Sequence, residues 1–271
     1  MFPGRGDGEL NRSRDHDTGE REIMKLNTKN GFDFGTNILD VEVPKALRTR
    51  IKTHVDYIDG SFGGQGITPS SVTLFTGTPG AGKTTMMLKL VDSLVGNGAI
   101  GVFNTGEESL YQVKLTAERL RLKNGFAVGE EIHVPTLLEN CDKLRAKHPN
   151  KQFVLVVDSL QTMDDGKYAD GSTNSRSPER ALSLITNWCK ENNTCAIVIG
   201  QVGKNGKFAG RNVLKHMVDA MMELTVEEDQ RSELFGCRIL EMTKNRFGGA
   251  GHRFYLDLKK NGFKVVAKIS A

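Results

Sequence analysis

Short, almost continuously apolar runs alternate with amphipathic segments through the middle of the chain. Runs of this kind are typical of parallel strands that are buried on both faces. They cover 72–75, 100–103, 153–157 and 196–199. Between them, apolar positions three and four residues apart predict helices. These helices are expected over 83–95, 110–122 and 178–191. Alternating strands and helices predict a parallel α/β sheet with right-handed crossovers.

After position 219 the pattern changes to apolar runs without long helices between them. The runs cover 221–226, 237–243, 253–258 and 263–268. This change predicts an antiparallel extension at one edge of the sheet. A short helix is also expected over 43–55. Residues 1–35 mix both charge signs with glycine and show no apolar period, which is typical of a disordered leader. We therefore expect one domain over 36–271.

Composition narrows the class of protein. Glycine makes up 30 of 271 residues, about 11%, against an average of roughly 7%, which indicates special loops or disorder. The net charge of +4 tolerates a polyanionic partner without requiring one. The four cysteines form no CxxC pair, so neither a zinc module nor a disulfide framework is indicated. The apolar runs are too short to cross a bilayer, and the N-terminus lacks the apolar stretch of a signal peptide. We expect a cytoplasmic protein.

A phosphate-binding loop is predicted between the run 72–75 and the helix that begins at 83. The residues there match G-x-x-x-x-G-K-[ST] at every fixed position, in the strand–helix context that the motif needs. We expect ATP phosphates to be held by Gly77, Thr78, Pro79, Gly80, Ala81, Gly82, Lys83, Thr84 and Thr85. Glycines let main-chain N–H groups converge on phosphate at the positive end of a helix, and Lys83 reaches the β- and γ-phosphates. The alternative is a glycine-rich turn that matches by chance.

Magnesium is expected beside this loop. Thr84 supplies a hydroxyl ligand, and Asp158 ends the apolar run 153–157. The carboxyl end of a parallel strand faces the ligand crevice, so Asp158 is placed to bind Mg²⁺ through its water shell. On its own, such an aspartate often caps the next helix, but together with the phosphate loop it predicts nucleoside triphosphate hydrolysis.

The base that orients the attacking water is expected after the run 100–103. Glu107 and Glu108 follow this run and would lie at the same sheet edge as the phosphates. We interpret Glu107 as the catalytic residue and Glu108 as a helix N-terminal residue that the helix dipole favours. The second role is also open to either glutamate.

Five segments resemble the bacterial RadA (Sms) family, a branch of the RecA superfamily. They are the glycine-rich approach 59–66, the segment 106–120 beginning GEESLYQVK, the segment DSLQTM at 158–163, the segment 209–219, and KNRFG at 244–248. In the family, residues 209–219 correspond to the second DNA-binding loop and the strand that follows. The resemblance covers roughly 50–260 and implies a RecA-like P-loop NTPase core.

The chain departs from this family in three ways. It shows neither the family's four-cysteine zinc module nor its Lon-like domain, and Arg211-Asn212 replace the usual Pro-Arg. The resemblance thus suggests a stripped RadA-like motor. If it comes from a virus or a mobile element, it would be located in the host cytoplasm.

RecA-type proteins assemble head to tail with ATP at the subunit interface. The resemblance therefore implies a homo-oligomer, either a hexameric ring or a filament, in which Lys244 and Arg246 complete the neighbour's site as charge stabilisers. The alternative is a basic β-turn that is simply solvated. Gln201 lies in the position of the RecA-type glutamine that senses the γ-phosphate.

DNA contacts are expected in two loops. The loop 203–216 carries no acidic residue, and single-strand binders combine such basic grooves with aromatic stacking. Its candidates are Lys204, Lys207, Phe208, Arg211 and Lys215. By resemblance, the loop 164–180 is the first DNA-facing loop, with Lys167, Arg176 and Arg180 as candidates. The alternative is that both are flexible loops with solubilising charges.

We therefore expect an ATP-dependent DNA motor that works in recombination and repair by branch migration or unwinding. Its partner would be single-stranded or branched DNA, and no membrane is expected. One alternative is a replicative helicase core similar to the DnaB family. A second is a nucleotide-gated oligomeric ATPase, similar to clock-protein ATPases, that acts on protein rather than DNA.

Overall fold

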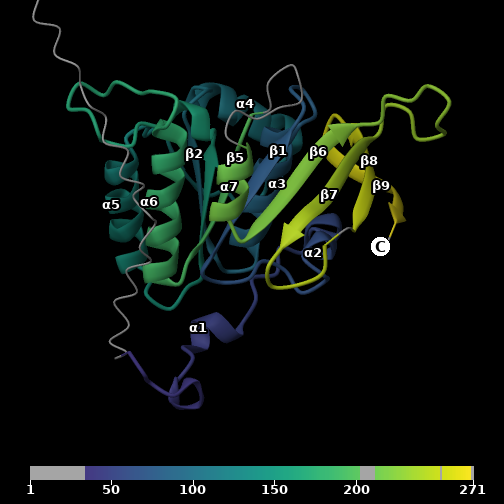
Figure 1. The fold of residues 1–271 in the computed structure, drawn as a ribbon. Helices are drawn as coiled ribbons and strands as arrows, with labels where there is room; N and C mark the ends of the chain where they lie inside the picture. Colours follow the sequence, from purple (N-terminus) through teal and green to yellow (C-terminus); the bar gives the residue numbers. More distant parts are fainter. Residues whose placement is uncertain (1–33, 202–210, 251, 270–271) are drawn as a thin grey trace, which may run out of the picture.

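One mixed sheet organises the chain in a computed structural model, which describes residues 34–201, 211–250 and 252–269. It has nine strands in the order β3-β2-β4-β5-β1-β6-β7-β8-β9 (Figure 1). The parallel part contains β1 (Ser71–Gly77), β2 (Ile100–Thr105), β3 (Ala127–Gly129), β4 (Phe153–Asp158), β5 (Cys195–Ile199) and β6 (Ala220–Val226). The antiparallel part contains β7 (Arg238–Asn245), β8 (Arg253–Lys259) and β9 (Gly262–Ile269). The predicted mainly parallel sheet with an antiparallel C-terminal extension is confirmed.

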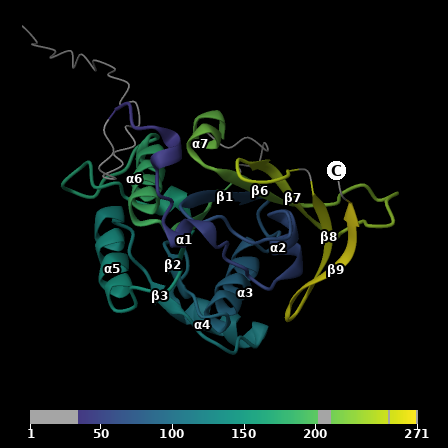
Figure 2. The same cartoon turned by 90° about the horizontal axis from the view of Figure 1, so that it is seen from below.

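Helices cover both faces of this sheet (Figure 2). One face carries α2 (Asp56–Ser61), α3 (Lys83–Gly96) and α4 (Leu110–Leu120). The other carries α5 (Val134–Ala146), α6 (Ser177–Asn192) and α7 (Arg211–Met217). Three short elements complete the described chain: η1 (Ile38–Asp40), α1 (Lys45–Arg48) and η2 (Leu160–Thr162).

The core consists of two apolar clusters, one on each face of the sheet. Strand β4 shows why its sequence is continuously apolar. Val154 and Val156 belong to the cluster under α3, whereas Phe153, Leu155 and Val157 belong to the cluster under α6. Side chains of a strand alternate between faces, so a strand covered on both sides needs an apolar residue at every position.

Two local predictions are wrong. The helix expected over 43–55 is limited to α1, because the main chain of Ile51 pairs with that of Ile67 and buries the Ile51 side chain. The resemblance also implies a strand at the end of the segment 209–219. The structure has the helix α7 there instead. Leu214 and Val218 are buried while Val213 is exposed, which is the four-residue spacing of a helix rather than the alternation of a strand.

The carboxyl ends of the parallel strands lie at the top of Figure 1, and α1 lies at the bottom. The predicted leader 1–35 falls almost entirely outside the described residues, so this boundary and the domain over 36–271 stay predictions. Among the helices described, none is long and apolar enough to span a bilayer.

Candidate nucleotide-binding site

The phosphate loop connects β1 to α3 at the carboxyl edge of the sheet. Its first turn is held by the neighbouring strand, since the N–H of Thr78 donates to the carbonyl oxygen of Leu224 at 3.1 Å. A Cβ at Gly77 would overlap this same carbonyl oxygen. Gly82, the residue before α3, has a φ of +104°, a conformation that glycine adopts without strain. The two glycines thus have distinct structural reasons to be where the motif requires them.

Lys83 folds back over the loop that precedes it. Its Nζ donates to the carbonyl oxygens of Gly77 and Thr78 at 3.0 and 3.1 Å. Burial lowers the pKa of the Lys83 ammonium, while the carboxylates of Asp158 and Glu107 act in the opposite direction. The ammonium is therefore bonded to the loop and lies within electrostatic reach of both carboxylates, where a phosphate chain bound by the loop would meet it.

Asp158 and Thr84 bring two oxygen atoms together beside this loop. The Oγ1 of Thr84 donates to the Oδ2 of Asp158 at 2.6 Å. The pKa of Asp158 is raised to about 6, chiefly by burial and also by the carboxylates of Glu107 and Glu108, against the hydrogen bond from Thr84 and the charge of Lys83. A buried carboxylate next to a hydroxyl fits Mg²⁺, which prefers hard oxygen ligands. When bound, the ion would neutralise negative charge on the phosphates.

Glu107 lies in the loop between β2 and α4. Its Oε1 accepts hydrogen bonds from the Oγ of Ser159 and, at 2.6 Å, from the Nε2 of Gln201. The main-chain N–H and carbonyl of Glu108 instead bond the Oγ1 of Thr105. Of the two glutamates, it is therefore the carboxylate of Glu107 that is held by polar side chains from the ends of the central strands.

The carboxyl edge thus collects residues that are far apart in sequence. Glu107 follows β2, Asp158 ends β4, Gln201 follows β5, and Lys83 and Thr84 follow β1. The interpretation of the sequence missed two members of this group, Ser159 and Gln161. Ser159 directly follows Asp158, so a polar residue at a strand tip was the available signal. Gln161 bonds the main chain of Gln201, and no pattern in the sequence indicates that pairing.

The remaining members of the loop, Pro79, Gly80 and Ala81, lie in the turn between Thr78 and Gly82. Thr85 is in the first turn of α3, and its Oγ1 accepts a hydrogen bond from Arg119 at 3.2 Å.

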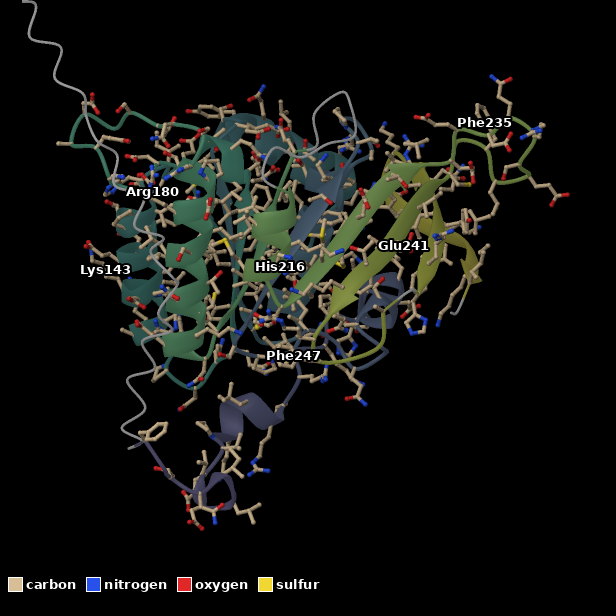
Figure 3. All side chains as sticks on the ribbon, in the orientation of Figure 1. Lys143, Arg180, His216, Phe235, Glu241 and Phe247 are labelled. Atoms are coloured by element: carbon tan, nitrogen blue, oxygen red, sulfur yellow. The ribbon has the colours of Figure 1, made fainter. Side chains whose placement is uncertain are left out.

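Lys244 and Arg246 lie at the opposite end of the sheet. Strand register places Asn245 beside Ala220, and Ala220 beside Thr73. Thr73 precedes Gly77 by four residues, which is roughly 13 Å along a strand. Figure 3 shows Phe247, the next residue after Arg246, at the lower end of the sheet. The basic pair is therefore remote from the phosphate loop of its own chain.

Both basic side chains are engaged within the chain. The Nζ of Lys244 donates to the carbonyl oxygens of Lys215 and Val218, each at 2.6 Å. Arg246 pairs with the buried Asp219 at 3.4 Å and donates to the carbonyl oxygen of His216. Burial, followed by the charge of Arg246, lowers the pKa of Lys244.

The expected DNA contacts divide into three groups. Lys204, Lys207 and Phe208 lie outside the described residues. Arg211 and Lys215 belong to α7 rather than to a loop, and Lys215 is exposed. This corrects the expected loop 203–216 at its C-terminal end.

The other loop candidates differ from one another. Lys167 and Arg176 are exposed, with the Lys167 ammonium 5.9 Å from the ring of Tyr168. Arg180 is in α6 and forms an ion pair with the buried Asp165. It also donates to Asn174 and Ser177. Arg180 thus stabilises the loop 164–180 through bonds within the chain. Figure 3 shows it near the top of the molecule.

No family model matches the chain, but curated proteins named DNA repair protein RadA do. The chain is 34% identical over 229 residues to the DNA repair protein RadA of Aquifex aeolicus, covering 84% of this chain and 48% of that protein. It is 35% identical over 223 residues to RadA of Mycobacterium tuberculosis, covering 82% of this chain and 44% of that protein. The chain therefore spans about half the length of the curated relatives it matches.

Solved structures share the fold at low sequence identity. One of them, an isolated ATPase domain, matches with a TM-score of 0.67 and 14% identity, over 83% of this chain and 94% of that one. A DnaB-like replicative helicase matches with a TM-score of 0.65 and 13% identity, over 79% of this chain and 61% of that one. These neighbours confirm the RecA-like fold class. The chain is a RadA-like protein, related to the RadA family over the part of those proteins that it spans.

Proposed function

We propose that this chain binds ATP with Mg²⁺ and hydrolyses it at the carboxyl edge of the sheet. The observation that carries the proposal is the meeting of Lys83, Thr84, Asp158, Glu107 and Gln201 at that edge. A phosphate loop alone supports binding. A carboxylate held by Ser159 and Gln201 within electrostatic reach of Lys83, and a second carboxylate beside the Thr84 hydroxyl, also support hydrolysis.

Each residue has a role that its surroundings support. Thr84 and Asp158 would hold Mg²⁺, whose charge would stabilise negative charge on the leaving ADP. Lys83 would exchange its two carbonyl partners for phosphate oxygens. Glu107 would orient the attacking water and accept its proton as the bond between the γ-phosphorus and the leaving oxygen breaks. Gln201, bonded to Glu107, would report the presence of the γ-phosphate to the residues that follow it.

We further propose that hydrolysis occurs between subunits of a homo-oligomer, either a hexameric ring or a filament. Lys244 and Arg246 are too far from their own phosphate loop to act on its nucleotide. A head-to-tail contact would bring them to the loop of the next subunit, where cationic side chains stabilise the charge of the transition state.

The polymer on which the motor acts is proposed to be DNA, single-stranded or branched, during recombination and repair. The relatives are named DNA repair proteins, and the segment before α7 carries basic residues without acidic ones. Branch migration or unwinding would be the work performed. A second candidate, a replicative helicase core, is supported by the fold shared with a DnaB-like replicative helicase.

The test is ATP turnover with no DNA, with single-stranded DNA and with a four-way junction, at low and moderate salt. We expect stimulation by DNA that fades as salt rises, because binding to phosphates releases counterions. Stronger stimulation by the junction favours branch migration, and stronger stimulation by single strands favours a helicase core.

The control uses charge reversal at two places. Reversing Lys204 and Lys207 together should remove the stimulation, whereas reversing the exposed Lys143 and Lys147 near the end of α5 should preserve it. Turnover without stimulation by either DNA at any salt would contradict the DNA role and favour action on protein.

A further inference from the structure

Strand β5 loses one of its two neighbours just before it reaches the candidate site. On one side, its register with β1 continues to the end, and the N–H of Gly200 donates to the carbonyl oxygen of Phe75 at 2.9 Å. On the other side, pairing with β4 ends at Val157 and Val198. There the chain of β4 turns away into η2. The main chain of Gln201 therefore has no strand beside it on that side.

The side chain of Gln161, in η2, takes the place of the missing strand. The N–H of Gln201 donates to the Oε1 of Gln161 at 3.2 Å, and the Nε2 of Gln161 donates to the carbonyl oxygen of Gln201 at 3.3 Å. A carboxamide carries the same donor and acceptor as a peptide group. One side chain thus satisfies both main-chain groups of one residue, as a neighbouring strand would.

This pairing holds the main chain of Gln201 in place, and therefore the point from which its side chain extends toward Glu107. The Nε2 of Gln201 lies 2.6 Å from the Oε1 of Glu107, and a shift of the Gln201 main chain would move that contact. In the part of the chain that the structure describes, the hydrogen bonds of the Gln161 amide go to the main chain of Gln201 rather than to Glu107, Asp158 or the phosphate loop. Any effect of Gln161 on those groups would have to pass through Gln201.

We propose that Gln161 is a positioning residue for hydrolysis, which holds the main chain of Gln201 so that its amide reaches Glu107. This role rests on the proposed ATPase function. Catalytic groups must be held in the productive geometry by the residues around them. Gln161 provides this support from the turn that directly follows Asp158, so it links the aspartate's strand to the glutamine's strand at the point where both meet the nucleotide.

The test replaces Gln161 with methionine, which keeps the length of the side chain and removes its amide. We expect turnover at saturating ATP to fall roughly tenfold, because about two neutral hydrogen bonds are lost. The dissociation constant for a fluorescent ATP analogue should be unchanged, since Lys83, Thr84 and Asp158 are untouched. The matched control is Gln152→Met. That glutamine also donates to a main-chain carbonyl, that of Thr49 at 3.1 Å, and precedes β4 at the opposite end of the sheet, so turnover should be preserved.

A double-mutant cycle separates positioning from a general structural effect. If Gln161 acts through Gln201, the double variant Gln161→Met/Gln201→Met loses no more turnover than Gln201→Met alone. Additive losses would overturn the proposal, and so would full turnover in Gln161→Met or in Gln201→Met.

Amide hydrogen exchange provides a readout that does not depend on hydrolysis. The N–H of Gln201 should exchange several-fold faster in Gln161→Met, while the N–H of Gly200, bonded to Phe75, should not change. Unchanged exchange at Gln201 would overturn the inference. If the wild-type chain has no turnover, the proposed function fails, and the exchange rate still decides whether Gln161 holds this main chain.

Discussion

A buried aspartate lies at each end of the parallel strands, and the two differ in how the surrounding residues compensate their negative charge. At the carboxyl end, Asp158 is 7% exposed and has a pKa raised to about 6, mainly because burial removes water without an equivalent compensating charge. At the amino end, Asp219 is 2% exposed and bonds the side chains of Lys190 and Arg246 and the N–H of Val72. The first aspartate is short of positive charge and the second is neutralised within the chain.

This difference indicates a separate role for each end of the sheet. A carboxylate that is destabilised in the free protein gains when a cation arrives, so the carboxyl end is suited to receive Mg²⁺ and nucleotide. The amino end holds its cations in place through Asp219 and the carbonyl oxygens at the C-terminal end of α7. For Arg246 to act on a neighbouring subunit, it must exchange these internal partners for phosphate.

The largest expected effect is at the carboxyl end. Lys83→Ala removes the ammonium that is bonded to the phosphate loop and interacts with the two carboxylates, and turnover should fall by roughly a thousandfold or more, with weaker nucleotide binding. Steady-state hydrolysis and titration with a fluorescent ATP analogue measure this. Lys114→Ala removes an exposed lysine of α4 that pairs with Glu118 and should preserve both quantities. Normal turnover in Lys83→Ala would contradict the assignment of the site.

Arg246→Ala should separate binding from hydrolysis. Because Arg246 is remote from its own phosphate loop, nucleotide affinity should be retained while turnover falls by about 10²–10³. The same two assays measure this. Arg253→Ala, which removes a basic residue paired with Glu241 on the neighbouring strand, should retain turnover. Loss of nucleotide affinity in Arg246→Ala, with the fold intact, would argue against a role in trans.

The third effect is on stability. Asp219→Asn leaves Lys190 and Arg246 without their shared carboxylate, so the free energy of unfolding should fall by about 3 kcal/mol. Urea denaturation followed by circular dichroism measures this. An unchanged midpoint would show that the amino end is not held together by this aspartate.

Asp158→Asn should change stability in the opposite direction. The pKa of Asp158 is raised on folding from 3.8 to about 6, so its contribution is favourable below the unfolded pKa and is lost as pH rises through the folded pKa. An uncharged asparagine avoids this loss, which amounts to about 3 kcal/mol at pH 7.5 and roughly half of that at pH 5.

The comparison requires urea denaturation at both pH values, with a chelator and without nucleotide. Asp158→Asn should be more stable than the wild-type chain at pH 7.5, and the difference should shrink at pH 5. Destabilisation by both substitutions, at either pH, would remove the contrast between the two ends.

Much of the carboxyl end was predictable because its geometry follows from local patterns. Apolar runs identify the strands, and parallel strands deliver whatever follows them to one edge. For this reason Lys83, Glu107, Asp158 and Gln201 could be expected near one another from the sequence alone.

Other features depend on contacts that no local pattern contains. The pairing of Gln161 with Gln201 arises because β4 turns away one residue before its neighbour ends, and the ion pairs of Asp219 join three separate elements. The helix α5 is a different case, since the buried Val134, Leu137, Leu138 and Cys141 follow a helical period that the sequence already displays. The helix α5 is therefore predictable from the sequence alone.

The most direct test of the account mixes two defective chains. Lys83→Ala keeps the basic pair and Arg246→Ala keeps the phosphate loop, so each should have almost no turnover alone. In an equal mixture, about a quarter of head-to-tail interfaces join an intact phosphate loop to an intact Arg246. We predict that the mixture regains up to about that fraction of wild-type turnover. A mixture that assembles and stays as inactive as its components would contradict the claim that the two ends complete one site.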